Sequence, residues 1–134
     1  MTVFVLDTNV LSDIIAPTPI QNVIAKIAAH RQDTICLCEA VEYEVRRGYL
    51  KTSATGKLKI YEERINPQFQ WVNITEADWQ QAARFWADAA NKGKALSDVD
   101  LLVAAVARRL AGIVVSADGD FDELPVQRVN WRLR

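Results

Sequence analysis

The chain has 134 residues, half of them apolar and a quarter charged, with a formal net charge of −1. That composition is typical of a globular protein, predicts one domain over residues 1–134, and excludes a disordered or strongly basic chain. No apolar run reaches the ~20 residues of a membrane-spanning helix, and the first residues lack a basic stretch and a signal cleavage site, so we expect a cytoplasmic protein.

Strands and helices are predicted to alternate in the first half of the chain. The continuous apolar run at residues 3–6 predicts a buried strand, and a second strand is predicted at residues 34–38. Residues 20–28 carry apolar side chains at helical spacing, and Ser53 is a possible cap for the last helix of this half. The predicted helices cover residues 9–15, 20–28, 40–50 and 53–64.

The second half continues the alternation. Thr75 followed by an acid three residues later predicts the start of a helix that runs to about residue 91, and Ser97 is predicted to cap a helix that ends near Gly112. The remaining predicted strands cover residues 70–74, 113–115 and 126–129. Strands that alternate with helices indicate an α/β sandwich with a mostly parallel sheet and helices on both of its faces.

The two cysteines, Cys36 and Cys38, lie two residues apart in a predicted strand, so their side chains share one face. That spacing favours buried free thiols over a disulfide. Two small core residues are also favoured over two of four metal ligands, because no other cysteine and only one histidine, His30, are present to complete such a site.

Acidic residues follow or precede the predicted strands at positions where a parallel sheet collects ligands. Asp7 follows the first strand and Asp118 the fourth, while Glu44 lies on the helix after the second strand and Asp100 opens the helix before the fourth. Ligands of such sheets bind beyond the carboxyl ends of the strands. If the first strand is central, Asp7 lies at the mouth of that crevice.

Each acid also has a purely structural interpretation. Asp7 or Asn9 would cap the first helix, and Glu44 would pair with Arg47 three residues later on the helix surface. Asp100 would share a capping box with Ser97, and Asp118 would be an ordinary turn acid before a glycine. The functional interpretation therefore depends on whether the four acids come together.

Carboxylates that converge repel one another, by about 4 kcal/mol for a pair at ~4 Å in an effective dielectric near 20. Such a cluster is tolerable when protons or a cation neutralise it. Carboxylate oxygens without histidine or cysteine suit Mg²⁺ or Mn²⁺, and a magnesium ion held by a few carboxylates is the arrangement that proteins use on phosphate substrates.

Four segments of the chain resemble the motifs of PIN-domain proteins, specifically VapC-type toxins, in the same order. FVLDTNVLS at the start is similar to the family's opening motif, and YEVRRG at 43–48 is similar to its glutamate segment. DLLVAAVA at 100–107 and VVSADGDF at 114–121 resemble its two later aspartate segments. VNW at 129–131 is similar to the ending of some members, here without their proline. The matches span residues 4 to 131.

The resemblance implies a PIN-like three-layer sandwich with the activity of a metal-dependent endoribonuclease. It implies the toxin of a toxin–antitoxin pair, active as a homodimer and inhibited by a small antitoxin that binds DNA. The implied metal is Mg²⁺ or Mn²⁺, with one or two ions possible. The implied catalytic and metal-binding acids are Asp7, Glu44, Asp100 and Asp118.

The resemblance also implies roles for these residues. Asp7, Asp100 and Asp118 would hold the metal, and Glu44 would orient the attacking water and help to remove its proton. Thr8, Asn9 and Ser116 would support the ligands through hydrogen bonds, with Ser116 in place of the commoner threonine. Asp98 and Asp120 are possible alternates, although the helix register favours Asp100 over Asp98 and the motif favours Asp118 over Asp120.

An acidic site needs basic residues nearby to hold RNA. Arg46, Arg47 and Lys51 are weak candidates for phosphate contacts, because charged helix faces are usually just solvated. Four residues of a predicted helix form one apolar face, for which packing in the core or in an interface is favoured over base stacking. They are Trp79, Ala83, Trp86 and Ala90.

Three other classes of protein place acids in an α/β fold. An aspartate-based phosphohydrolase would need an acid at position 9, where this chain has Asn9. A receiver-like signalling domain that binds magnesium would need a phosphate-accepting aspartate after a central strand, and none is in place. A catalytically idle interaction module is the remaining alternative, which four intact acids argue against.

Overall fold

A computed structural model describes residues 1–134. Its centre is a five-stranded sheet in the order β3-β2-β1-β4-β5, in which every neighbouring pair is parallel. The strands are β1 (Val3–Leu6), β2 (Thr34–Cys38), β3 (Gln70–Val72), β4 (Ile113–Val115) and β5 (Gln127–Val129). β1 is the middle strand, which is the condition under which Asp7 is expected to lie at the mouth of the crevice. This order differs from the 2-1-3-4-5 order of receiver domains, which argues against that alternative.

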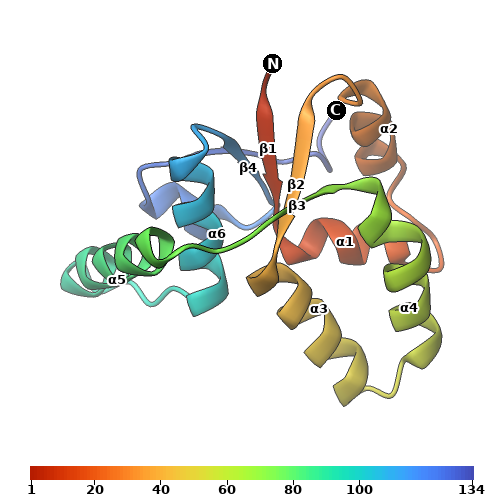
Figure 1. Ribbon diagram of the computed structural model, residues 1–134, viewed down its shortest axis with the longest axis horizontal. Helices are drawn as coiled ribbons and strands as arrows, with labels where there is room; N and C mark the ends of the chain where they lie inside the picture. The colour runs from red at the N-terminus through yellow and green to blue at the C-terminus, as the bar shows by residue number, and fades with distance from the viewer.

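Helices lie on both sides of the sheet, which confirms the predicted three-layer α/β sandwich (Figure 1). Figure 1 shows α5 and α6 on one side and α1, α2 and α4 on the other. The helices are α1 (Thr8–Ile15), α2 (Gln21–Ala29), α3 (Glu39–Lys51), α4 (Thr55–Ile60), α5 (Glu76–Asn91) and α6 (Asp98–Arg109). Shorter helical turns are η1 (Tyr61–Ile65), η2 (Asn66–Gln68) and η3 (Gly119–Glu123). None of the helices has both the length and the apolarity needed to cross a membrane.

The helix starts in the second half agree with their sequence signals. Thr75 and Asp78 form the predicted capping box of α5, each side chain bonding the other's backbone N–H. Ser97 caps α6 by accepting from the Asp100 amide at 3.1 Å. The Asp100 carboxylate accepts no hydrogen bond from the Ser97 amide, so the capping box is incomplete. The carboxylate is therefore available to face the carboxyl end of the sheet.

Two local predictions are wrong. Ser53 does not cap a helix: it has a φ of 55°, and α4 begins at Thr55 after Ala54. The third strand ends at Val72 rather than at residue 74. Its end is explained by Ile74, whose amide donates to both carboxylate oxygens of Glu39 at 2.8 and 3.1 Å instead of continuing the sheet.

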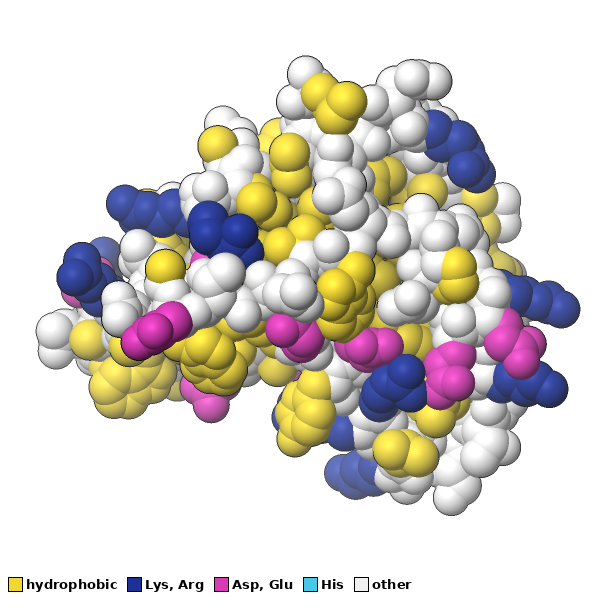
Figure 2. All heavy atoms as spheres, in the orientation of Figure 1, with side chains coloured by type: hydrophobic (Ala, Val, Ile, Leu, Met, Phe, Trp, Pro, Cys, Tyr) yellow, Lys and Arg dark blue, Asp and Glu magenta, His cyan; other side chains and the backbone are white.

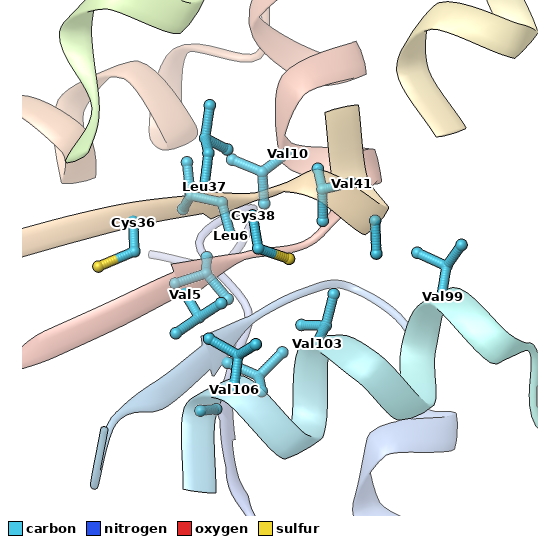
Figure 3. Close-up of a cluster of buried hydrophobic side chains, with 14 of the residues drawn as sticks. Val5, Leu6, Val10, Cys36, Leu37, Cys38, Val41, Val99, Val103 and Val106 are labelled. Carbon is cyan, nitrogen blue, oxygen red and sulfur yellow. The ribbon is translucent and has the colours of Figure 1, made fainter. Parts of the chain in front are cut away.

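The core lies between the sheet and its helices. Figure 3 shows Val5 and Leu6 of β1 beside Val103 and Val106 of α6. The two cysteines of β2 are buried and free, as predicted. The same contacts that bury β1 hold its carboxyl end, and with it Asp7, in a fixed place.

The apolar face predicted on α5 is not in the core. The helix is rotated so that Ala82, Phe85 and Ala89 face inward, while Trp79 and Trp86 are 58% and 56% exposed. Figure 2 shows hydrophobic side chains gathered on the surface over α5. Packing in the core is therefore excluded for the two tryptophans, and an interface remains open to them.

Candidate active site

Asp7 is placed by the end of β1. Its amide donates to the Val115 carbonyl at 3.0 Å, which continues the pairing of β1 with β4 by one residue. Asp7 occupies the N-cap position of α1, yet its side chain makes no capping hydrogen bond. The carboxylate is 4% exposed and is free to take part in contacts beyond the strand ends.

A short network joins Asp7 to the end of β4. Ser116 Oγ donates to Asp7 Oδ2 at 2.8 Å and accepts from the Asp118 amide at 3.0 Å. Asn9 Nδ2 donates to Ser116 Oγ at 2.9 Å and, more weakly, to Asp7 Oδ2 at 3.3 Å. The network fixes the Asp7 carboxylate and the loop after β4 relative to each other, across more than 100 residues of sequence.

Three further carboxylates converge beside Asp7. Asp100, Asp118 and Asp120 each bring one carboxylate oxygen within 4.8 Å of the other two. Asp118 is held by its Oδ1 atom, which accepts from the Asp120 amide at 2.8 Å at the start of η3. The sequence favours Asp118 over Asp120, whereas the structure brings both into the same group.

All of these acids line one pocket of about 580 Å³. Its lining is almost entirely polar and contains no lysine or arginine. The lining residues are Asp7, Thr8, Asn9, Ser12, Glu44, Ala95, Ser97, Asp100, Asp118 and Asp120. Residues predicted from four separate segments of the sequence therefore line one pocket, while the group within 4.8 Å contains Asp100, Asp118 and Asp120 and does not include Asp7 or Glu44.

Two predicted acids differ in their relation to this pocket. Glu44 lines the pocket and also accepts a hydrogen bond from Arg47 Nη2 at 3.3 Å. The structural and the functional interpretation of Glu44 therefore both hold. Asp98 does not line the pocket and faces the apolar grooves beside Trp79 instead. Asp98 and Asp100 are two positions apart, which on a helix turns their side chains to different faces.

Ser12 lines the pocket but was not predicted. Its hydroxyl donates to the Thr8 carbonyl at 3.4 Å, one helical turn earlier on α1. The spacing of four residues from Thr8 is the signal that would have indicated it.

Burial and repulsion raise the pKa values of two acids in the pocket, Asp7 and Asp100. The pKa of Asp7 is raised chiefly because burial disfavours its charged form, against the lowering effect of the Ser116 hydrogen bond. The pKa of Asp100 is raised to about 7 by burial and by the nearby charges of Asp7 and Asp118. In the metal-free pocket, the charged forms of Asp7 and Asp100 are therefore disfavoured.

The donor set fits a divalent cation. Asp7 Oδ1 and Thr8 Oγ1 are both buried and have no hydrogen-bond partner, which costs free energy unless another group satisfies them. Carboxylate and hydroxyl oxygens, without sulfur or imidazole, are ligands for a hard ion such as Mg²⁺ or Mn²⁺. A cation here would relieve the repulsion and satisfy the buried oxygens at once.

Basic residues lie outside the pocket on α3. Arg46 pairs with Glu62 at 2.7 Å and with Glu42 at 3.2 Å. The Arg47 guanidinium lies 5.1 Å from the centre of the Tyr43 ring, in addition to its bond to Glu44. Lys51 is the last residue of α3 and is exposed. Arg47 is thus the predicted RNA contact that touches a residue of the pocket.

Comparison with known proteins gives one family and a set of similar folds. The PIN domain model matches residues 4–127. No curated protein matches the chain. Among solved structures, FitAcB from Neisseria gonorrhoeae is 24% identical, with a TM-score of 0.84 over 98% of this chain and 99% of that one.

Two further solved structures have the same fold. DNA-bound VapBC from Salmonella typhimurium is 20% identical, with a TM-score of 0.84 over 98% of this chain and 99% of that one. VapBC-5 from Mycobacterium tuberculosis, a member of the VapBC family of toxin–antitoxin systems, is 20% identical, with a TM-score of 0.67 over 97% of this chain and 99% of that one. These similarities cover nearly the whole length of both chains, so the sandwich described above is shared in full.

Proposed function

The chain belongs to the PIN domain family, and from that premise we propose that it is a divalent-metal-dependent endoribonuclease, the VapC-type toxin of a toxin–antitoxin pair. The observation that carries the proposal is the buried Asp7 carboxylate, which faces a pocket of further acids with no lysine or arginine in its lining. Such an arrangement is costly for an idle interaction module and useful for an enzyme that acts on phosphodiesters.

In this proposal Asp7, Asp100 and Asp118 hold Mg²⁺ or Mn²⁺, with Asp120 close enough to share that role. The chemistry that such an ion supplies when bound is stabilisation of charge on phosphate oxygens and a lowered pKa of water. Glu44, at the wall of the pocket, orients the attacking water and accepts its proton. Its hydrogen bond to Arg47 keeps that carboxylate in place.

The neighbouring polar residues fix the ligands. Ser116 and Asn9 each donate a hydrogen bond to Asp7 Oδ2, and Asn9 also donates to the Ser116 hydroxyl. These bonds leave Asp7 Oδ1 without a partner and available to the pocket. Thr8 does not make the hydrogen bond expected of it: its buried hydroxyl, on the same wall, has no partner. Partners such as Ser116 and Asn9 set the orientation of a carboxylate and with it the affinity of a metal site.

RNA is held from outside the pocket in this proposal. Arg47 lies between the exposed ring of Tyr43 and the Glu44 carboxylate, so a phosphate beside the site would meet its guanidinium. Arg46 and Lys51 extend positive charge along the same helix. Contacts of this type position the RNA backbone without reading its bases.

The proposed partners are a cognate antitoxin and a second copy of the chain, both in the cytoplasm. An antitoxin partner is supported by the fold shared with VapBC, a family described as toxin–antitoxin systems, and with a VapBC structure that is bound to DNA. A homodimer is supported by the exposed apolar side chains of α5, because uncovered patches of this kind commonly mark protein interfaces.

Cleavage of RNA by the purified protein tests the proposal. We expect cleavage with Mg²⁺ or Mn²⁺, loss of cleavage in excess EDTA, and recovery when the metal is restored. Binding of the ion is measured separately by calorimetry on the same preparation. Undiminished cleavage in EDTA would overturn the metal mechanism, and metal binding without any cleavage would favour an interaction module.

A further inference from the structure

Two of the three carboxylates that lie within 4.8 Å of one another belong to one short segment of the chain. Asp118 and Asp120 belong to the segment of residues 116–123, a loop that follows β4 and includes η3. Asp100, the third, is fixed by a helix instead. The convergence therefore depends on how firmly this loop is held against the end of the sheet.

One arginine spans the loop from the outside. Arg128 of β5 donates from Nε to Asp122 Oδ1 at 3.0 Å and from Nη2 to Asp122 Oδ2 at 2.9 Å. Its third donor, Nη1, bonds the Ser116 carbonyl at 3.1 Å. The guanidinium thus joins the residue that begins the loop to a residue after both acids, with Asp118 and Asp120 between the two anchors.

The two anchors are also linked to the pocket itself. The same Ser116 whose carbonyl accepts from Arg128 bonds Asp7 and the Asp118 amide through its hydroxyl. The Arg128 side chain is 20% exposed and its bond to the Ser116 carbonyl is partly buried, whereas the Asp122 end of the fork is 60% exposed and competes with water. A planar fork with two parallel bonds fixes direction as well as distance, which a lysine cannot reproduce.

We propose that Arg128 is a positioning residue that sets the divalent-cation affinity of the pocket by holding Asp118 and Asp120 in their convergent arrangement. The inference rests on the proposed metal site. It assigns a function to a residue that lines no part of the pocket and lies outside every motif of the sequence.

Positioning and charge predict opposite results, which makes the inference testable. The positive charge of Arg128 acts on Asp118 and by itself disfavours a second cation nearby, so removing only that charge would tighten metal binding. Removing the fork frees the loop and weakens metal binding. Loss of an outer hydrogen-bonding partner typically lowers metal affinity by about 10–100-fold.

The experiment is a calorimetric titration of the purified chain with Mg²⁺ and Mn²⁺, together with urea unfolding of each variant. We expect Arg128→Gln to weaken binding by about tenfold or more. Arg128→Lys and Asp122→Asn are also expected to weaken it, since each removes the two-bonded fork and keeps the positive charge that itself disfavours a cation near the loop. Binding that is unchanged or tighter in Arg128→Gln overturns the inference.

A matched control is present in the same chain. Arg132 makes an equivalent fork on Asp13, at 2.7 and 2.8 Å, away from the pocket. Arg132→Gln is expected to lower the free energy of unfolding without changing metal affinity, and an equal loss of affinity would overturn the inference. If the unmodified chain itself binds no divalent ion, the proposed metal site fails first, so the two failures are distinguishable.

Discussion

Asp13 and Asp78 each lie beside an arginine, whereas Asp7, buried to a similar degree, lies in a pocket without one. The three are 6%, 1% and 4% exposed. Arg132 bonds both carboxylate oxygens of Asp13, and Arg109 Nε bonds both oxygens of Asp78 at 2.9 and 3.1 Å. Asp7 has hydrogen bonds from Ser116 and Asn9 and no ion pair.

The difference extends to the pKa values. Burial alone would raise the pKa of Asp78, but its bonds to Arg109 and to the Thr75 backbone outweigh burial and lower it. The pKa values of Asp7 and Asp100 are raised instead. The fold thus neutralises a buried acid that has only a structural role, such as Asp78 in the capping box of α5. At the carboxyl ends of β1 and β4 it leaves the negative charge for an external cation.

The largest expected effect follows from removing the uncompensated charge. Asp7→Asn should lower RNA cleavage by more than about 100-fold, because the loss of an outer partner alone costs a metal site about 10–100-fold. The control is Asp13→Asn, in which an equally buried carboxylate is lost from an arginine pair. Cleavage per folded molecule should be unchanged in the control. A fully active Asp7→Asn variant would contradict the distinction between the unpaired acid in the pocket and the acids paired with arginine.

The compensated acids should matter for stability instead. Arg109→Gln leaves Asp78 buried without its cation and should lower the free energy of unfolding by about 2–3 kcal/mol, somewhat below the range for fully buried pairs because Arg109 is 32% exposed. Urea unfolding measures the loss. Metal affinity should not change, and the double variant with Asp78→Asn should recover part of the stability. A single variant as stable as the parent would contradict this role.

The same comparison predicts opposite dependences on pH. The lowered pKa of Asp78 contributes stability above its ordinary value of 3.8, and this contribution is lost as the pH falls. The pKa of Asp100 is raised to about 7, so its contribution is present in acid and is lost as the pH rises from about 4 through about 7 in the metal-free protein.

Asp100→Asn should therefore stabilise the metal-free protein at neutral pH. A gain of about 1 kcal/mol would raise the Tm by roughly 3–5 °C in a chain of this size. Thermal unfolding in EDTA and in Mg²⁺ measures both effects, since the variant should also lose the stabilisation that the parent gains from the ion. A variant destabilised in EDTA would show that repulsion in the pocket is small.

The smallest effect is expected for the acid outside the pocket. Asp98→Asn should change metal affinity by less than about twofold, because this exposed carboxylate faces the apolar grooves beside Trp79 and only screened, long-range attraction is lost. Asp120→Asn, on the loop held by Arg128, should weaken binding clearly more. Calorimetry on the two variants decides between them, and the reverse order would place the metal on the other side of α6.

The sequence determined the secondary structure and the candidate acids because both depend on local signals. The apolar run at residues 3–6, the capping box at Thr75 and the Ser97 cap each specify structure within a few residues. The acids follow the same logic, since a residue placed directly after a parallel strand lies at its carboxyl end in any arrangement of the sheet.

Only the tertiary structure decided which of these groups meet. The order of the strands places β4 beside β1, so Ser116 bonds Asp7 across 109 residues, and it places β5 beside β4, so Arg128 reaches the acid-bearing loop. The pairing of Arg132 with Asp13 and the rotation that exposes Trp79 and Trp86 have no local signal either. Such contacts are set by sheet order and helix packing, which depend on the burial of the whole core rather than on the residues that make the contact.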